Sequence, residues 1–300
     1  MNSCIRALCA ALLFPALACA APRDDLLVSA EWLAAHLDDP ALVILHIGAG
    51  YRKQHIRGAR PVSLEDITVS DHSDMRRMRM LDLPSPEDLR RRLEALGIGD
   101  ASRVVVYFGD DEVSPATRVL FTLDAAGFGA RSALLDGGLP AWIRDGHPVT
   151  REVPAAPRAA LAALAMQARV VDAEFVRRHA QAPGFALIDG RAAALYDGVD
   201  TGGSPMQRHK TGHIAGARSL PFSAVTDLAH RLRPEAALRA LFDAAGVKPG
   251  DTIVAYCHIG QQATAVLFAA RTLGHPVQLY DGSFEDWSLR DLPVVPSAAP

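Results

Sequence analysis

The sequence predicts an α/β protein with two domains in tandem, each a parallel sheet flanked by helices. Three observations support this prediction. Short apolar strands alternate with amphipathic helices, the two halves of the chain carry the same segments in the same order, and a segment rich in Ala and Pro separates them. The length of 300 residues also fits two domains of about 150 residues better than one.

The composition is that of a globular protein, with 49% hydrophobic and 22% charged residues. The net charge is −3, from 31 Lys and Arg against 34 Asp and Glu. General binding of nucleic acid or of anionic membranes needs an excess of basic residues, so we predict no nucleic-acid partner. The 23 Gly, 20 Pro and 4 Cys exclude collagen-like and disulfide-dense scaffolds.

Residues 1–20 are predicted to be a signal peptide. Arg6 precedes an apolar run over residues 7–18, which is too short to span a bilayer as a helix, so we expect no membrane span. Ala18-Cys19-Ala20 has the small residues of a cleavage site. The mature chain would then start at Ala21, and the protein would be periplasmic or secreted.

Two other interpretations of this leader remain open. A buried N-terminal helix is disfavoured because Pro15 interrupts the run, and a lipoprotein anchored at Cys19 is disfavoured because Ala16 stands where Leu is usual. Cleavage after Ala20 would remove Cys4, Cys9 and Cys19 and leave Cys257 alone. A lone thiol cannot form an internal disulfide, and alone it cannot hold a Cys-rich zinc site.

The repeat aligns the two halves over their whole length. An apolar strand ends 17 residues after each helix cap, at His46 in one half and at Asp189 in the other. The other paired segments are 29–33 with 172–176, 54–60 with 212–218, 97–108 with 246–257, and 136–142 with 281–287. We therefore predict domains over residues 24–150 and 170–296, joined by a linker over 151–169 that contains a helical stretch.

Local patterns predict the elements in order. Ser29 and Asp172 are N-cap residues, each followed by an acid in the first turn of a helix. Amphipathic or strongly helix-forming segments predict helices over 86–96, 234–245 and 263–270. β-Branched runs predict strands over 104–107 and 252–256.

Cys257 lies between the predicted strand 252–256 and the predicted helix 263–270. In open parallel sheets, ligands bind at the carboxyl ends of the strands, where this residue would lie. Gly260 lets the loop curl so that successive N–H groups point at the sulfur, and the start of the helix adds partial positive charge. Both effects favour the thiolate, so we predict a nucleophile; the alternative is an inert buried cysteine.

The segment 256–264, Tyr-Cys-His-Ile-Gly-Gln-Gln-Ala-Thr, resembles the active-site loop of rhodaneses, the thiosulfate and mercaptopyruvate sulfurtransferases. Three further segments, 187–191, 212–217 and 281–287, resemble other motifs of this family, and the resemblance extends from about Asp24 to Val295. It implies that Cys257 takes sulfur from a small anionic donor, thiosulfate first and 3-mercaptopyruvate second. The resulting persulfide would pass sulfur to a thiophilic acceptor such as cyanide or a thiol, without a cofactor.

The resemblance also implies roles for residues around Cys257. Asp189 and Arg191 would brace the loop and present positive charge near the donor. The residues that would form the loop and bind the donor are His258, Ile259, Gly260, Gln261 and Gln262.

Three features depart from the family pattern. The loop residues His258, Gln261 and Gln262 stand where mercaptopyruvate enzymes have small polar residues. Ile259 stands where vertebrate-type rhodaneses carry a basic residue, and Leu195 stands where some relatives have a substrate-binding Arg. Donor charge could instead be met by Arg191, by His258 or by the insertion 197–211, which holds Arg208, His209 and Lys210. We expect this insertion to be a solvated surface loop.

The first domain is predicted to be catalytically silent. Phe108 aligns with Cys257, and His46 and Gly48 replace Asp189 and Arg191. We expect this domain to cover the site and to contribute to its cleft, as interdomain pockets often require.

Other functions could use the same cysteine. A cysteine phosphatase needs an Arg six residues after the nucleophile, where this chain has Ala263, and a thioredoxin-like oxidoreductase needs a second cysteine. A metal site at His209, His213, Cys257 and His258 lacks ligand spacing, and we expect His213 to be structural. The alternatives that remain are a persulfide carrier or sulfur-binding protein serving a protein partner, and a non-catalytic binding protein.

Overall fold

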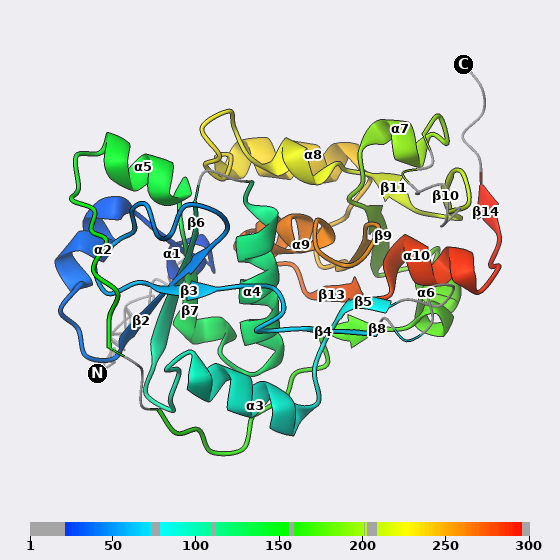
Figure 1. Ribbon diagram of the computed structural model, residues 1–300. Helices are drawn as coiled ribbons and strands as arrows, with labels where there is room; N and C mark the ends of the chain where they lie inside the picture. Colours follow the sequence, from blue (N-terminus) through cyan, green and yellow to red (C-terminus); the bar gives the residue numbers. More distant parts are fainter. Residues whose placement is uncertain are drawn as a thin grey trace, which may run out of the picture.

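The computed structural model describes residues 22–71, 73, 79–109, 112–155, 159–200, 202 and 209–295. The predicted signal peptide lies outside these ranges. Within them, no helix is long and apolar enough to cross a membrane. Figure 1 shows two sheets, one in each half of the molecule, with two helices packed between them.

The sheet of the first domain has five parallel strands in the order β1-β7-β6-β2-β3. These strands are β1 (Leu27–Val28), β2 (Leu42–Ile47), β3 (Arg60–Val62), β6 (Arg103–Phe108) and β7 (Ser132–Leu135). An antiparallel pair, β4 (Val69–Asp71) and β5 (Arg79–Asp82), extends from it toward the second domain. The helices are α1 (Pro22–Leu26), α2 (Ala30–His36), α3 (Pro86–Ala95), α4 (Ser114–Ala125), η1 (Gly129–Arg131) and α5 (Gly138–Arg144).

The sheet of the second domain repeats this order as β8-β13-β12-β9-β11, again with every pair parallel. These strands are β8 (Val170–Val171), β9 (Phe185–Asp189), β11 (Arg218–Ser219), β12 (Thr252–Tyr256) and β13 (Val277–Tyr280). The helices are α6 (Ala173–His179), α7 (Ala193–Tyr196), η2 (Phe222–Val225), α8 (Glu235–Ala244), α9 (Ala263–Thr272) and α10 (Ser283–Leu289). A short antiparallel pair is formed by β10 (His213–Ile214) and β14 (Val294–Val295). The predicted fold of two parallel sheets flanked by helices is confirmed.

The duplication extends to individual hydrogen bonds. The hydroxyl of Tyr107 accepts the N–H of Ile56 at 3.0 Å, and the hydroxyl of Tyr256 accepts the N–H of Ile214 at 3.1 Å. The predicted caps also form, because the Ser29 and Asp172 side chains each accept an N–H from the first turn of the following helix. Corresponding residues of the two halves therefore occupy corresponding places, and the end of β6 can be compared directly with the end of β12.

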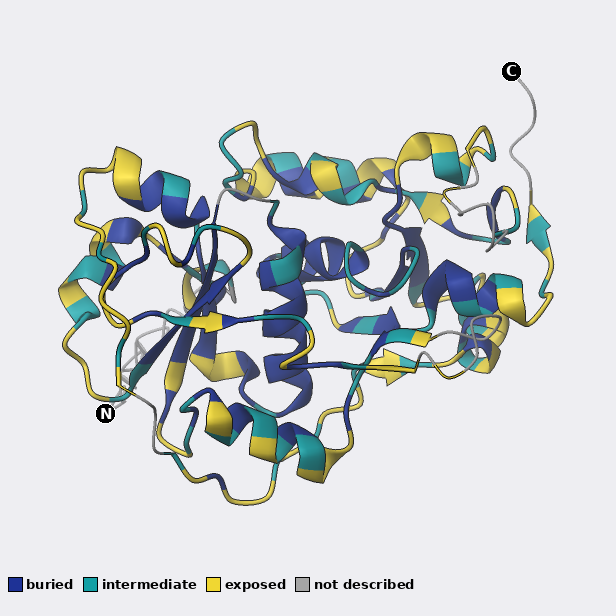
Figure 2. Cartoon of the chain, in the orientation of Figure 1, coloured by how far each residue is buried: buried dark blue, intermediate teal, exposed yellow. Residues whose placement is uncertain are grey.

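Helices α4 and α9 pack against each other in the centre of the molecule, between the two sheets (Figure 1). Both are buried almost along their whole length (Figure 2), as expected of a helix that is covered on every side. Buried residues of the two helices, such as Val119 and Leu267, belong to one continuous apolar cluster that includes core residues of both domains. The two domains therefore share a core, and the beginning of α4 lies beside the beginning of α9.

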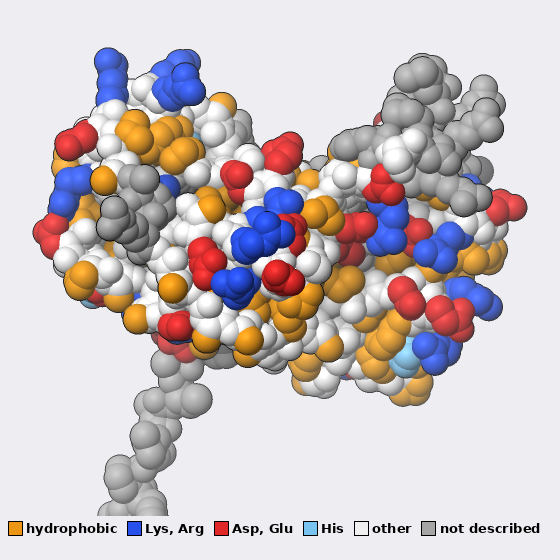
Figure 3. All heavy atoms as spheres, turned by 60° about the horizontal axis from the view of Figure 1, so that its bottom comes forward, with side chains coloured by type: hydrophobic (Ala, Val, Ile, Leu, Met, Phe, Trp, Pro, Cys, Tyr) orange, Lys and Arg blue, Asp and Glu red, His pale blue; other side chains and the backbone are white. Residues whose placement is uncertain are grey.

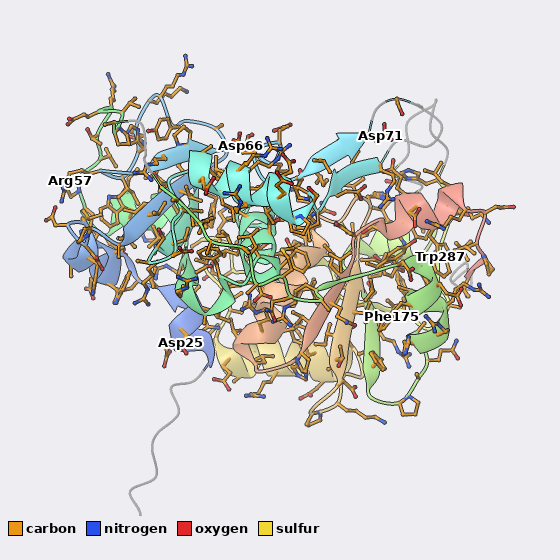
Figure 4. All side chains as sticks on the ribbon, turned by 90° about the horizontal axis from the view of Figure 1, so that it is seen from below. Asp25, Arg57, Asp66, Asp71, Phe175 and Trp287 are labelled. Atoms are coloured by element: carbon orange, nitrogen blue, oxygen red, sulfur yellow. The ribbon has the colours of Figure 1, made fainter. Side chains whose placement is uncertain are left out.

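The face drawn in Figure 3 carries both apolar and charged side chains. Phe175 of α6 and Trp287 of α10 lie at the outer end of the second domain, far from the first domain (Figure 4), and pack into a separate apolar cluster. On the face drawn in Figure 3, basic and acidic side chains are interspersed. Helix α3, for example, carries the ion pairs Arg90–Glu94 and Arg92–Asp88, each at 2.7 Å.

The linker differs from its prediction. We expected a helical stretch within residues 151–169, but the described part, 151–155 and 159–169, contains no helix. Its backbone instead hydrogen-bonds to the first domain, where the Leu161 N–H donates to Glu94 Oε1 at 2.9 Å and the Gln167 N–H to Ala125 O at 2.8 Å. Bonds to groups outside the segment replace the bonds that an Ala-rich helix would make internally.

Candidate active site

Cys257 follows β12 directly, at the carboxyl end of the middle strand of the second sheet. The residue is 1% exposed. Its N–H donates to Ser283 Oγ at 3.2 Å, and its carbonyl accepts the N–H of Phe284 at 3.0 Å. The first residues of α10 therefore fix the backbone of the residue that carries the sulfur.

The loop after Cys257 presents unpaired backbone amides. Within the described part of the chain, the N–H groups of the six residues from His258 to Ala263 form no hydrogen bond. Gly260 has the positive φ of +81° that the predicted curl requires, and α9 begins at Ala263 without a side-chain cap. A run of free N–H groups at the start of a helix attracts negative charge, so this loop can hold a thiolate, a persulfide or a sulfur oxyanion.

The residues of the loop differ in how far they are exposed to solvent. Ile259, Gln261 and Gln262 are half-buried, whereas Gly260 is buried. Gln261 Nε2 donates to Ser114 Oγ at 2.9 Å, so this amide is held by the first domain. The binding capacity of the loop consequently lies in its backbone more than in its glutamines.

The first domain contributes more to the loop than the sequence analysis predicted. Thr117 Oγ1 lies 2.9 Å from Thr264 Oγ1, and Arg118 Nη1 donates to the carbonyl of Gly260 at 2.9 Å. With Ser114, these residues form a polar stripe at positions i, i+3 and i+4 along the first turns of α4. That spacing was readable in the sequence, but its partners are 142 to 147 residues further along the chain.

Asp189 and Arg191 form a closed ion pair beside the loop. Arg191 Nη2 lies 2.6 Å from Asp189 Oδ2, and its Nε contacts both carboxylate oxygens. Arg191 also donates to Gly212 O at 2.8 Å, and its guanidinium stacks 3.8 Å from the Phe284 ring centroid. The pair ties the end of β9 to its neighbours, and the Arg191 guanidinium is partnered by the Asp189 carboxylate and by Gly212 O.

Removal of one partner of this pair is expected to destabilise the second domain. Arg191→Ala would leave the buried Asp189 carboxylate unpaired, and we expect it to lower the free energy of unfolding by about 3–5 kcal/mol and to weaken use of the donor. The double variant Asp189→Asn/Arg191→Met removes both charges and should lose less. Urea unfolding of both proteins measures the difference; equal losses would show that the charges are not coupled.

His258 is a neutral imidazole in this site. Burial, followed by the positive charges of Arg191 and His209, lowers the pKa of His258 from 6.5 to about 4. Its two ring nitrogens are buried and form no hydrogen bond with the described residues. A neutral ring supplies no charge to a donor at neutral pH.

The low pKa of His258 predicts a loss of stability in acid. In the unfolded chain the ring titrates near 6.5, so between pH 6.5 and about 4 the unfolded state binds a proton that the folded state does not. Stability should therefore fall as the pH decreases through this window, by about 2–3 kcal/mol from this group. Urea unfolding of His258→Gln should show a correspondingly smaller loss; identical pH profiles would contradict a neutral His258.

The insertion 197–211 is not simply a solvated loop. The ring of His209 lies 5.0 Å from that of His258, and its side chain is 8% exposed. Any side chain at Gly202 would overlap the His258 ring. Lys210 pairs with Asp291 at 2.7 Å instead of reaching the loop, and Arg208 lies outside the described residues.

The corresponding place in the first domain holds no nucleophile. Phe108 ends β6, is fully buried and packs on Gly138 and His230. His46, which replaces Asp189, has its Nε2 3.2 Å from Ala49 O. At the position where the second domain has the Cys257 thiol, the first domain has the buried Phe108 side chain, which packs in the core.

His213 has the structural role that the sequence analysis expected. Its Nδ1 lies 3.0 Å from Tyr196 O, and the two rings stack at 3.8 Å. His55 repeats both contacts with Tyr51 in the first domain. Among the described residues, no group of three His, Cys, Asp or Glu side chains is arranged to hold a metal ion.

The fold and the loop place the chain in a known family. Residues 29–145 and 172–290 each match the rhodanese-like domain. The chain belongs to the rhodanese family, and both matches fall inside the predicted domains.

Relatives that match along almost the whole chain are sulfurtransferases and a sulfur carrier. The 3-mercaptopyruvate sulfurtransferase of Escherichia coli is 30% identical over 285 residues, which cover 90% of this chain and 97% of the relative. The thiosulfate sulfurtransferase of Rattus norvegicus is 31% identical over 288 residues, with 89% and 93% covered. Sulfur carrier protein TtuD of Thermus thermophilus is 28% identical over 278 residues, with 88% and 94% covered.

The fold agrees with a solved structure of the same family. The crystal structure of SseA, a 3-mercaptopyruvate sulfurtransferase from Escherichia coli, superimposes with a TM-score of 0.72 at 27% identity. The superposition covers 86% of this chain and 98% of that one. Similarity at this level supports sulfur transfer in general and leaves the donor undecided.

Proposed function

We propose that this protein is a sulfurtransferase that moves a sulfane sulfur from a small anionic donor to a thiophilic acceptor through a persulfide on Cys257. One observation carries the proposal. Cys257 directly follows β12, the middle strand of its sheet, and is itself followed by six backbone N–H groups that have no partner in the described chain. Such a loop stabilises negative charge on sulfur at each stage of the reaction.

The chemistry needs no oxidant or reductant. The Cys257 thiolate attacks the outer sulfur of thiosulfate, the S–S bond of the donor breaks, and sulfite leaves with the bonding electron pair. Cyanide or a thiolate then attacks the outer sulfur of the persulfide. With cyanide, thiocyanate departs and the Cys257 thiolate is restored for the next cycle.

Thiosulfate is the proposed donor, with 3-mercaptopyruvate as the second candidate. A compact dianion suits a cradle of backbone amides, whereas a 2-oxo acid carboxylate is bound best by a free guanidinium. Arg191 is already paired with Asp189, and Leu195 offers no charge. Steady-state kinetics with cyanide as the acceptor should give a kcat/KM at least about tenfold higher for thiosulfate; the reverse ratio would assign 3-mercaptopyruvate.

A persulfide carrier serving a protein partner is the second candidate. The relative named as a sulfur carrier favours it. A carrier should accept sulfur from the donor but release it to cyanide slowly. Single-turnover measurements of persulfide formation and of thiocyanate release therefore separate the two functions.

We also propose that the protein is exported and acts outside the cytoplasm. The support is the leader pattern of residues 1–20, in which a short apolar run precedes small residues at positions 18–20. N-terminal sequencing of the protein recovered from the periplasm or the medium should begin at Ala21. Recovery with Met1 retained would contradict export by cleavage.

A further inference from the structure

Arg118 of the silent domain is buried against the active-site loop. It belongs to α4 and has no exposed surface. Its Nη1 donates to Gly260 O at 2.9 Å and to Asp281 Oδ1 at 2.6 Å, and its Nη2 donates to Leu81 O. One guanidinium thus joins the loop, the turn after β13 and the β4–β5 segment of the first domain.

The bond to Gly260 sets the direction of the next amide. In a trans peptide the C=O and the following N–H point in opposite directions. Because Arg118 holds the Gly260 carbonyl on one side of the loop, the N–H of Gln261 is turned to the other side. Release of that carbonyl would let the peptide rotate and would remove one amide from the run that follows Cys257.

The ion pair with Asp281 has a second effect. The Asp281 side chain is 4% exposed and its Oδ2 also accepts the N–H of Leu83 at 3.1 Å. Its Oδ1 lies 2.8 Å from the place that a side chain on Gly260 would occupy, so this carboxylate adjoins the loop. Without Arg118, the loop would face an uncompensated negative charge, which disfavours a second anion nearby.

We propose that Arg118 is a positioning residue for the reaction at Cys257, and that the first domain is therefore a working part of the active site. Its guanidinium fixes the Gly260–Gln261 peptide and cancels the charge of Asp281. Only the expected change in kcat rests on the proposed sulfur transfer. The shape and charge of the loop can be measured through the thiol itself.

The same helix pair offers a matched control. At the far end of α4 and α9, Arg271 lies 3.2 Å from Asp124, which also pairs with Arg169 at 2.6 Å. Helix α9 is 10 residues long, which places this second interdomain ion pair ~15 Å from the loop. A variant at Arg271 therefore weakens the domain interface without touching the Gly260 carbonyl.

The test compares Arg118→Lys with Arg271→Lys in the full-length protein. Lysine keeps the charge but loses the planar fork that reaches three acceptors. We expect Arg118→Lys to shift the alkylation of Cys257 by iodoacetamide to higher pH by about one unit. We also expect kcat for sulfur transfer to fall about tenfold with KM nearly unchanged. Arg271→Lys should match wild type in both assays.

Two results would overturn the proposal. One is an alkylation profile of Arg118→Lys that superimposes on wild type, and the other is an equal shift in Arg271→Lys, which would indicate domain docking alone.

Should Arg118→Lys not fold, as judged by circular dichroism, Arg118→Met/Asp281→Asn removes the ion pair without leaving a buried charge and is measured in the same way. Alkylation needs no sulfur donor, so failure of wild type to accept sulfur would reject the proposed function and leave this result standing. None of these variants replaces another titratable residue near the loop. Those residues are Asp189, Arg191, His209, His258 and Glu285.

Discussion

Replacing Cys257 by serine is expected to abolish sulfur transfer while the protein stays folded. A serine hydroxyl is not ionised at neutral pH and cannot form the persulfide, so kcat/KM should fall by at least about a thousandfold. The hydrogen bonds that fix this position are made by the backbone N–H and C=O of Cys257, and serine keeps both. The rate of thiocyanate formation measures the loss, and circular dichroism and urea unfolding establish that the fold is retained.

One result with Cys257→Ser would contradict the covalent mechanism. Cys257 is the one cysteine that the predicted mature chain contains, because the other three lie in residues 1–20. Turnover retained in Cys257→Ser would therefore mean that sulfur moves without a protein thiol. The covalent mechanism would then be wrong, whatever the donor.

The second large effect is expected from Gly260→Ala. Gly260 has φ of +81°, and a Cβ there would lie 2.7 Å from Asp281 O and 2.8 Å from Asp281 Oδ1. The left-handed conformation costs an alanine about 1–2 kcal/mol, and the overlap with Asp281 adds to this. We expect the free energy of unfolding to fall by about 2–4 kcal/mol and kcat to fall about a hundredfold, because the loop must shift.

A matched variant separates backbone strain from loop geometry. Gly246 has a similar φ of +74°, but nothing lies within 4 Å of the place its Cβ would occupy. Gly246→Ala should therefore lose about 1 kcal/mol of stability and keep the wild-type kcat. Equal effects of the two alanine variants on kcat would contradict the role assigned to the loop curl.

The local part of the site could be predicted from the sequence. The strand 252–256, the turn at Gly260 and the start of the following helix are set by β-branched residues, by a glycine and by helix-forming residues that are neighbours in the chain. The duplication predicted two equivalent domains, and the two sheets do have the same strand order. Patterns within about 15 residues were sufficient for the strand, the turn and the helix, and comparison of the two halves was sufficient for the duplication.

Contacts across the chain could not be predicted in the same way. Arg118 lies 142 residues from Gly260, and nothing in its immediate sequence indicates that partner. His209 and Gly202 reach His258 from an insertion that has no counterpart in the first half. In each case tertiary packing decides the contact, and a polar residue in a buried helix is only a hint that some partner exists.

The most direct test of the persulfide mechanism is the intact mass of the mature protein after incubation with thiosulfate and again after addition of cyanide. We predict the addition of a single sulfur atom, its removal by cyanide, and no addition in Cys257→Ser. No added sulfur from thiosulfate would exclude that donor, and the same result with 3-mercaptopyruvate would contradict a persulfide enzyme.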